Sequence, residues 1–244
     1  MNPIPARIAL LTLTVGALGA CGSGSSSNGG SGDRSSESAA QIVQDVRSSL
    51  AGFSSVHLGG TTSSSGKNYT FDLIVVPPRG LAGTISSSGA GSFKLVTTDN
   101  GTFYLTPDQQ FWSTYAGSLG SSYVQQLAGK CFTTPGSGSQ FGSLSTDFGK
   151  ISDLRHSFDS SVIGTVTKGA ERTVNGQQVI PLKASDGTEI DVPAQGAALP
   201  VQVSQSSGVT MTLTQWNQAG TISAPTNCVS ITQLLQGLAI PTPS

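Results

Sequence analysis

The sequence predicts an α+β protein built on an antiparallel meander of strands, and two observations carry this prediction. Stretches with apolar residues at every second position are separated by turns rich in Gly, Asn and Asp, as in successive hairpins. The helical patterns stand before, between and after two groups of such strands. Helices and strands segregated in this way are typical of α+β folds, whereas regular alternation of the two would predict a parallel sheet.

The first helix is expected from residue 38 to about residue 50. Ser38 and Gln41 have the spacing of a capping box, in which each satisfies a backbone N–H of the other. One helical face then carries the apolar residues Ile42, Val43, Val46 and Leu50. Gly52 is expected to end the helix.

The first strand group is expected between Val56 and Leu105. Period-two or apolar stretches predict strands at 69–76, 81–85, 92–98 and 103–105. The last two strands flank Asn100-Gly101, a dipeptide that tolerates the positive φ of a type I′ turn. Phe111 and Trp112 are expected to form an aromatic cluster where this group ends.

Two amphipathic helices are expected in the middle of the chain. One carries Leu119, Tyr123 and Leu127 on one face, and the other covers residues 144–158. The second strand group is expected at 162–167, 172–174, 178–182, 188–192, 199–204 and 209–214. Residues 229–238 are expected to form a short last helix. Trp112 and Trp216 are interpreted as packing anchors.

The N-terminus has the features of a bacterial lipoprotein signal. Arg7 precedes an apolar run from Ile8 to Leu18, and Leu18-Gly19-Ala20-Cys21 resembles a lipobox in which the Cys21 thiol is acylated. The run is shorter than the 18 or so apolar residues that a spanning helix needs. The alternative is an ordinary secretory signal followed by an incidental cysteine.

These features predict three parts of the chain. Residues 1–20 are a lipoprotein signal peptide, residues 21–37 are the lipidated Cys21 with a flexible tether, and residues 38–244 are one folded domain. Residues 22–37 carry no apolar side chain whose burial could offset the entropy of ordering. The expected location is the extracytoplasmic face of the cell membrane, where the lipid holds the domain.

Cys131 and Cys228 are expected to form a disulfide, because an even pair of cysteines outside the cytoplasm usually does. The competing interpretations are free thiols, or a metal site that also uses His57 and His156. Those four residues lack the close ligand spacing of metal sites.

Composition and motifs argue against several functions. A formal net charge of −1, with 10% charged residues, provides no basic surface for phosphates, so nucleic acid is not an expected partner. The sequence contains no Gly-x-Ser-x-Gly elbow and no glycine-rich phosphate loop leading to a lysine. We therefore expect no enzymatic activity, no cofactor and no metal.

Three stretches of the sequence carry a resemblance to a known family. They are Asp99-Asn100-Gly101-Thr102-Phe103-Tyr104-Leu105, Arg172-Thr173-Val174-Asn175-Gly176-Gln177-Gln178 and Gly208-Val209-Thr210-Met211-Thr212-Leu213-Thr214-Gln215-Trp216. These stretches resemble the LppX/LprA/LprF/LprG lipoprotein family of mycobacteria and other actinomycetes. Together with the helix at 38–50 they sample most of residues 38–222, and their order and spacing carry the resemblance. Cys131, Cys228 and the extension after Pro225 depart from the family pattern.

The resemblance implies an antiparallel half-barrel sheet, covered on its concave side by helices around an apolar cavity. Such a cavity holds acylated lipid or glycolipid, which the protein helps to transport to the outer envelope. Apolar strand residues that could line it are Leu73, Val75, Ile85, Leu95, Val96, Phe103, Leu105, Val203, Met211 and Leu213. The alternative is that these residues fill a solid core, in a surface scaffold or adhesion module that binds a protein partner. A third possibility is docking to a transporter.

Overall fold

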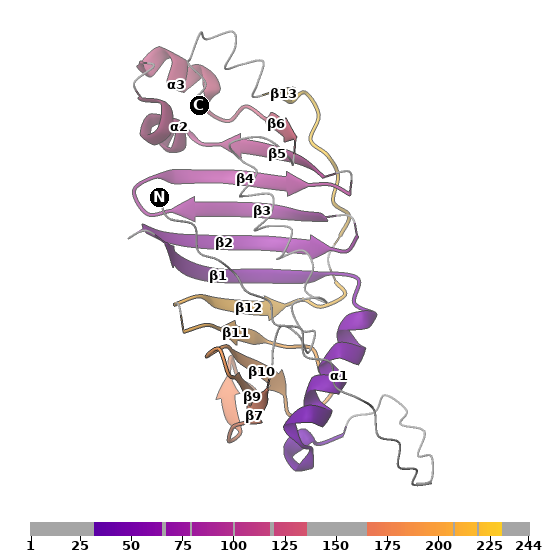
Figure 1. Cartoon of the computed structure of the whole chain (residues 1–244). Helices are drawn as coiled ribbons and strands as arrows, with labels where there is room; N and C mark the ends of the chain where they lie inside the picture. Colours follow the sequence, from indigo (N-terminus) through magenta and orange to yellow (C-terminus); the bar gives the residue numbers. More distant parts are fainter. Residues whose placement is uncertain are drawn as a thin grey trace, which may run out of the picture. The chain divides into compact units, whose positions relative to one another are not determined.

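The structure, a computed structural model, describes residues 32–64, 67–78, 80–99, 101–117, 120–135, 165–206, 208–218 and 220–230. All of them belong to one compact unit, Ser31–Ser244. The predicted α+β class is confirmed: within the described residues, one large open sheet accompanies a few short helices (Figure 1).

The two predicted strand groups join into a single sheet of 13 strands. The first group comprises β1 (Val56–Ser64), β2 (Lys67–Val76), β3 (Gly80–Ser87), β4 (Gly91–Thr97), β5 (Thr102–Pro107) and β6 (Phe132–Pro135). The second comprises β7 (Val166–Lys168), β8 (Arg172–Val174), β9 (Gln177–Ala184), β10 (Glu189–Pro193), β11 (Gln202–Ser204), β12 (Thr210–Thr214) and β13 (Val229–Ser230). The groups meet where β12 pairs with β1.

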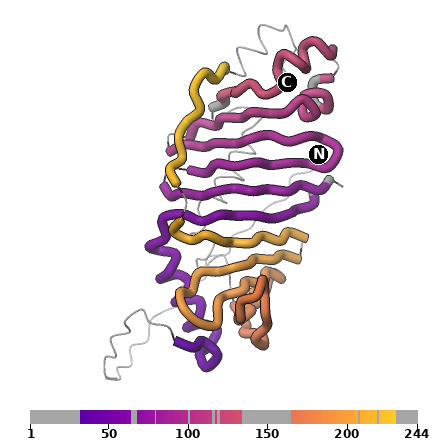
Figure 2. The backbone as a smooth tube through the Cα atoms, turned by 180° about the vertical axis from the view of Figure 1, so that it is seen from behind, coloured from indigo at the N-terminus to yellow at the C-terminus, as the bar shows by residue number. Residues whose placement is uncertain are grey.

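The spatial order is β13-β6-β5-β4-β3-β2-β1-β12-β11-β10-β9-β7, and β8 also pairs with β9. Neighbouring strands are antiparallel, except that β13 runs parallel to β6. The sheet is therefore mixed, which corrects the prediction of a wholly antiparallel one. The parallel pair arises because the segment after β12 passes the ends of the intervening strands before it reaches β6 (Figure 2).

The first helix is confirmed as α1 (Ala39–Ala51), with Ser38 as its N-cap and Gly52 as its C-cap. The capping box is complete: Ser38 Oγ accepts the Gln41 N–H at 3.3 Å, and Gln41 Oε1 accepts the Ser38 N–H at 2.8 Å. The buried residues of α1 are the predicted Ile42, Val43, Val46 and Leu50. A single 3-10 turn, η1 (Arg34–Ser36), precedes it and was not predicted.

The predicted aromatic cluster of Phe111 and Trp112 is confirmed, since Trp112 packs edge-to-face on Phe111 at 5.5 Å and on Phe132 at 5.3 Å. Both residues lie in α2 (Gln109–Ala116), a helix that was not predicted. Asp108 starts this helix by accepting the Phe111 N–H on its carboxylate at 2.7 Å. The next helix, α3 (Ser121–Leu127), is shorter than predicted, and its Tyr123 is 43% exposed instead of facing inward. Leu119 lies outside the described residues.

Two further predictions need correction near the disulfide. Val229–Ser230 is a strand and not the start of a helix, and β6 was not predicted. Neither segment is long enough to show a clear period, because β6 has four residues and β13 has two. The predicted helix at 144–158 and residues 231–238 lie outside the described residues, as do residues 162–164.

The described apolar side chains form two cores. The larger unites α1 with residues from β1 to β5 and from β9, β10 and β12. The smaller unites Trp112, Val124, Leu127 and Phe132 from α2, α3 and β6. Both tryptophans pack as predicted: Trp216 packs edge-to-face on Phe53 at 5.4 Å and donates its indole N–H to Pro200 O at 3.0 Å.

Candidate functional site

The pairing register places most of the large apolar strand residues on one face of the sheet. Side chains alternate between faces along a strand, so directly paired residues share a face. One cross-strand row runs through Leu213, Leu58, Leu73, Gly83, Leu95, Leu105 and Phe132. A second runs through Leu182, Ile190, Val203, Met211, Gly60, Phe71, Ile85 and Phe93. We call the side of the sheet with these rows the apolar face.

The apolar face contains nine of the ten residues suggested as cavity lining. Leu73 and Val75 are 0% exposed, Leu95 and Leu213 are 1% exposed, and Ile85, Phe103 and Leu105 are also buried. Val203 and Met211 are half-buried against the same core. Burial of this kind fits either residues that line a cavity or residues that fill a solid core. A measurement of the lipid bound to the protein distinguishes these two arrangements.

Val96 does not belong to this set. It pairs with Ala82 and Tyr104 and therefore lies on the opposite face from its neighbour Leu95. Hydrophobicity alone suggested Val96, and the register corrects that suggestion.

Four residues of β9 and β10 extend the apolar face beyond the sequence prediction. They are Ile180, Leu182, Ile190 and Val192, each at most 3% exposed and all in the same core as α1. Residues 179–182 form an uninterrupted apolar run that conceals the period of two. Pairing with β10 reveals which of these side chains share the face with Met211.

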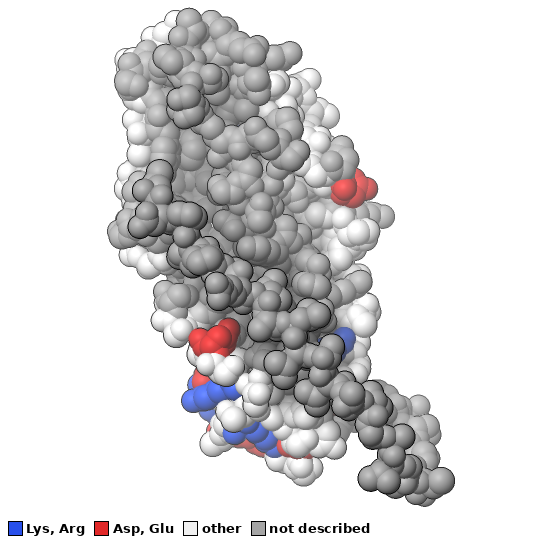
Figure 3. Space-filling view, viewed as in Figure 1, with Lys and Arg blue, Asp and Glu red and all other residues white. Residues whose placement is uncertain are grey.

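Charge is segregated to the other face, which we call the polar face. The charged residues of the sheet that lie there include Asp72, Lys94, Lys183, Glu189 and Asp191, as their alternation with the apolar rows requires. Most of the charged side chains visible in Figure 3 gather at the end of the sheet that carries β7, β9 and β10.

Lys168 of β7 differs from these residues, because it pairs with Leu182 and so shares its face. Its Nζ donates to three carbonyl oxygens, those of Arg34, Ser35 and Glu37, at 2.9, 2.5 and 2.9 Å. A lysine ammonium has three donors, and here all of them are used. The ammonium group of Lys168 is therefore fully hydrogen-bonded to the turn before α1.

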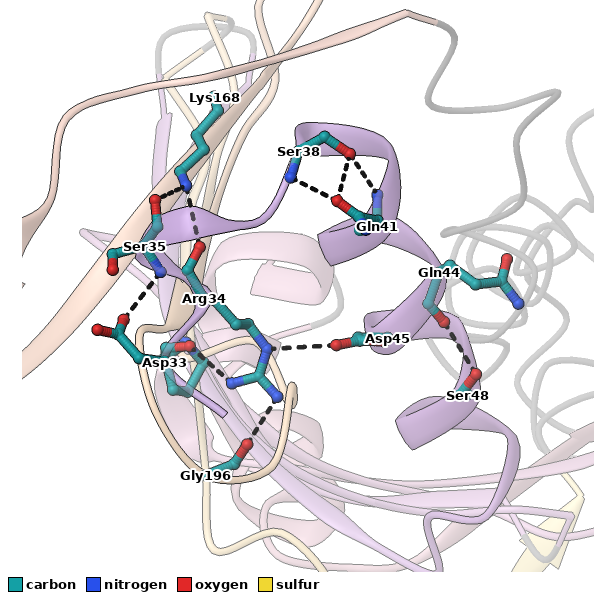
Figure 4. A network of polar contacts seen from close by, with 11 residues as sticks. Asp33, Arg34, Ser35, Ser38, Gln41, Gln44, Asp45, Ser48, Lys168 and Gly196 are labelled. Carbon is teal, nitrogen blue, oxygen red and sulfur yellow. Dashed lines mark hydrogen bonds and ion pairs between the residues drawn. The ribbon is translucent and has the colours of Figure 1, made fainter. Parts of the chain in front are cut away.

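Arg34 fixes the same turn from the opposite side and is only 5% exposed (Figure 4). Its guanidinium donates to Pro193 O at 3.1 Å and to Gly196 O at 2.6 Å, and its Nε lies 3.7 Å from Asp45 Oδ2. The Arg34 backbone N–H also donates to Ala194 O at 2.9 Å. We call this set of contacts, with those of Lys168, the anchor clamp. Sequence reasoning missed it, since Arg34 stands in a stretch that composition assigns to the tether.

An ion-pair cluster occupies the polar face of β8 to β10. Arg172 donates to both carboxylate oxygens of Asp191, at 2.8 and 2.7 Å, and pairs with Glu189. Lys183 extends the cluster, with Nζ 3.3 Å from Glu189. The hydrogen bonds to Asp191 raise the pKa of the Arg172 guanidinium, against the opposing effect of burial. Asp191 is 1% exposed, so the ion pair with Arg172 compensates the charge of a buried carboxylate and connects β8 to β10.

His57 connects three strands on the polar face. Its Nε2 lies 2.8 Å from Asp72 Oδ1 on β2, and its Nδ1 lies 3.1 Å from Thr214 Oγ1 on β12. The contacts join the two strand groups across the β12–β1 pair. His156, the other histidine, lies outside the described residues.

Cys131 and Cys228 are bonded to each other, in agreement with the prediction, and their Cα atoms are 4.5 Å apart. Cys21 lies outside the described residues. Within the part of the chain that the structure describes, no helix is both long and apolar enough to cross a bilayer, and no cluster of three or more His, Cys, Asp or Glu side chains could hold a metal.

No protein-family description matches the chain, and no curated protein matches its sequence. Among solved structures, the chain is similar to the lipoprotein LppX of Mycobacterium tuberculosis, with a TM-score of 0.41 and 13% identity over 76% of this chain and 98% of that one. An uncharacterised conserved protein of Thermus thermophilus gives a TM-score of 0.38 and 7% identity, over 79% of this chain and 98% of that one.

MucB in the MucA/MucB complex of Pseudomonas aeruginosa gives a TM-score of 0.34 and 15% identity, over 78% of this chain and 59% of that one. At these TM-scores and identities the likenesses support no conclusion about the family or function of this chain.

Proposed function

We propose that the protein is a membrane-anchored envelope lipoprotein that binds acylated lipid or glycolipid along the apolar face and assists the transport of that lipid to the outer envelope. The observation that carries the proposal is the continuity of the apolar face, which runs from β9 to β6. The lipobox at Cys21 and the sequence resemblance described above support the anchor and the class of ligand.

Hydrophobic transfer supplies the binding free energy in this proposal. Each buried methylene contributes about 0.8 kcal/mol, so ten methylenes of one acyl chain contribute about 8 kcal/mol before the cost of ordering the lipid. Such a ligand needs no charged partner on the apolar face, where the charge of Lys168 is already taken up by carbonyl oxygens. Binding and release of this kind require no cofactor, metal or catalytic group.

The proposal is tested by the lipid that the protein carries. We would express a Cys21→Ala variant, which has no covalent acyl group to confuse the result, and extract the purified protein with organic solvent. Mass spectrometry should find about one acylated lipid for each protein molecule. A protein that carries none, and that takes up none from lipid micelles, would favour the filled-core scaffold.

A pair of variants on one strand locates the lipid. Met211 and Thr210 are neighbours on β12, but Met211 lies on the apolar face and Thr210 lies exposed on the polar face. Met211→Glu should reduce the lipid bound per folded molecule severalfold, because a carboxylate is costly to place against hydrocarbon. Thr210→Glu is the matched control and should leave the bound lipid unchanged. Equal effects of the two substitutions would contradict binding along the apolar face.

The alternative scaffold predicts an exposed apolar patch of several hundred Å² for its protein partner. The large apolar side chains exposed among the described residues are Tyr123 on α3 and Val229 on β13. No interaction of the described residues favours this alternative over lipid binding.

A further inference from the structure

We infer that the end of the sheet formed by β7, β9 and β10 faces the membrane, and that the end formed by β4, β5 and β6 points away from it. The inference rests on the proposed lipid anchor and adds an orientation, which determines the end of the apolar face that a membrane lipid meets first. The observation that carries it is the anchor clamp, which fastens the chain to one end of the sheet just after the predicted tether (Figure 4).

The clamp makes Asp33–Ser38 a fixed point of departure for the tether. Arg34 is held by carbonyl oxygens of Pro193 and Gly196, which lie at the end of β10 and in the loop that follows it. Lys168 of β7 holds the next carbonyls of the turn, and Asp33 accepts the Ser35 N–H at 2.9 Å. A pull on the tether is therefore transmitted directly to β7 and to the end of β10.

The tether is short compared with the sheet. About a dozen residues separate Cys21 from Asp33, and a Gly/Ser-rich chain of this length has a root-mean-square span of about 20 Å. Seven strand spacings of about 4.8 Å, or about 34 Å, separate β10 from β5. A lipid at Cys21 thus keeps the β10 end near the bilayer while the β5 end lies beyond the mean reach of the tether.

The ion-pair cluster supports the same direction. Its two cations, Arg172 and Lys183, are paired with Glu189 and Asp191, so the cluster itself carries no net charge that a lipid surface would repel.

The test measures the distance of each end from a bilayer in the complete lipidated protein. A fluorescent amino acid would be introduced at exposed Gln195, beside the clamp, or at exposed Ser122 on α3, leaving the native cysteines untouched. The protein would be bound to phosphatidylcholine vesicles that contain a headgroup-labelled acceptor lipid. Energy transfer from position 195 should exceed that from position 122 by about twofold or more, given the tether span and sheet length above.

A matched control uses the same labels in a chain with about 40 extra Gly/Ser residues inserted after Ser27, which doubles the mean tether span to about 40 Å. The difference between the two labels should then shrink. Flotation with the vesicles is recorded in each experiment. A protein that does not float overturns both the anchor and the orientation. A protein that floats but shows equal or reversed transfer in the short-tether form overturns the orientation alone and leaves the proposed function standing.

Discussion

Arg34 illustrates how one side chain can determine where a folded domain begins. It is a charged residue in a Ser/Gly-rich stretch, yet it is 5% exposed and its guanidinium donates to two carbonyl oxygens, one at the end of β10 and one in the loop that follows. Those carbonyls and Asp45 compensate the cost of removing the charge from water. Asp33–Ser38 is therefore ordered by a residue that composition places in the tether.

Replacement of Arg34 should test this role directly. Arg34→Ala should lower the free energy of unfolding by about 2–3 kcal/mol, because hydrogen bonds from a charged donor are lost and buried carbonyl oxygens remain without a partner. Urea denaturation followed by circular dichroism measures the change. Gln44→Ala, at an exposed position of the adjacent helix, is the control and should cost less than about 0.5 kcal/mol. Equal effects of the two substitutions would contradict the role of the anchor clamp.

Asp108 joins a helix to a strand through its carboxylate. One oxygen accepts the Phe111 N–H at 2.7 Å, and the other accepts the Ser92 N–H at 2.8 Å and the Ser92 hydroxyl at 2.7 Å. Burial acts to raise the pKa of this carboxyl, but the hydrogen bonds from Phe111 and Ser92 outweigh it and hold the pKa below 3.8. A lowered pKa means that folding favours the ionised form.

This shift predicts a pH dependence with a definite sign. The stability due to the Asp108 carboxylate is fully present above its unfolded-state pKa and is lost as the pH falls through the lower folded-state value. Asp108→Asn should therefore cost about 1 kcal/mol at pH 7, the usual worth of a helix cap, and progressively less below about pH 4. Denaturation curves of both proteins between pH 7 and pH 2.5 check this. A deficit that stays constant over that range would contradict the assignment.

At the scale of elements, the C-terminal strand depends on a covalent link more than on its own sequence. β13 has two residues, and its one partner among the described strands is β6. The disulfide joins Cys131, just before β6, to Cys228, just before β13, across a sequence separation of 97. The Val229 N–H donates to Cys131 O at 3.0 Å, so the link and the strand pairing support each other.

Loss of the disulfide should destabilise the fold substantially. Closure of a loop of this length corresponds to about 4–5 kcal/mol in the chain-entropy treatment, less any strain in the native bond. The Cys131→Ser, Cys228→Ser double variant should therefore unfold at a much lower urea concentration, and amides of β6 should exchange faster with solvent. Thiol titration of the unfolded Cys21→Ala chain without reductant should find no free thiol. Two reactive thiols in that chain would contradict the bond.

The local sequence pattern predicted α1 but not α2, and the two helices differ in the contacts that stabilise them. In α1 the capping box and a buried stripe of Ile42, Val46 and Leu50 agree with each other. In α2 the adjacent aromatic residues Phe111 and Trp112 resemble the end of a strand in sequence. Their helix forms because Asp108 caps its N-terminus and because Trp112 packs against Phe132, with their ring centroids 5.3 Å apart. That second contact comes from a strand twenty residues away in the chain.

For the molecule as a whole, the proposed transport depends on the proposed lipid anchor at Cys21. Cys21→Ala should abolish incorporation of labelled palmitate and shift the protein from the membrane fraction to the soluble fraction of the exporting cells. Thioether formation at this cysteine is the basis of the expectation, so Cys21→Ser should behave in the same way. Palmitate retained by either variant would contradict a lipobox at Leu18-Gly19-Ala20-Cys21.

In this protein, local sequence determines which segments form helices, strands and turns, whereas long-range contacts determine which strands pair. The amino-acid sequence by itself determined the α+β class, the capping box of α1 and hairpin turns such as Asn175-Gly176, whose φ angles are 50° and 80°. Each of these depends on residues within a few positions of one another, where propensity and hydrogen bonding act locally.

Only the tertiary structure decided that β12 pairs with β1, that β13 lies beside β6 and that Arg34 and Lys168 meet at one turn. It also decided that Leu95 and Val96 lie on opposite faces. These features depend on register and on contacts between residues far apart in the chain, and a shift of one residue in pairing would exchange the faces. The apolar face is therefore a property of the assembled sheet, although each residue of its two cross-strand rows is apolar or small in the sequence.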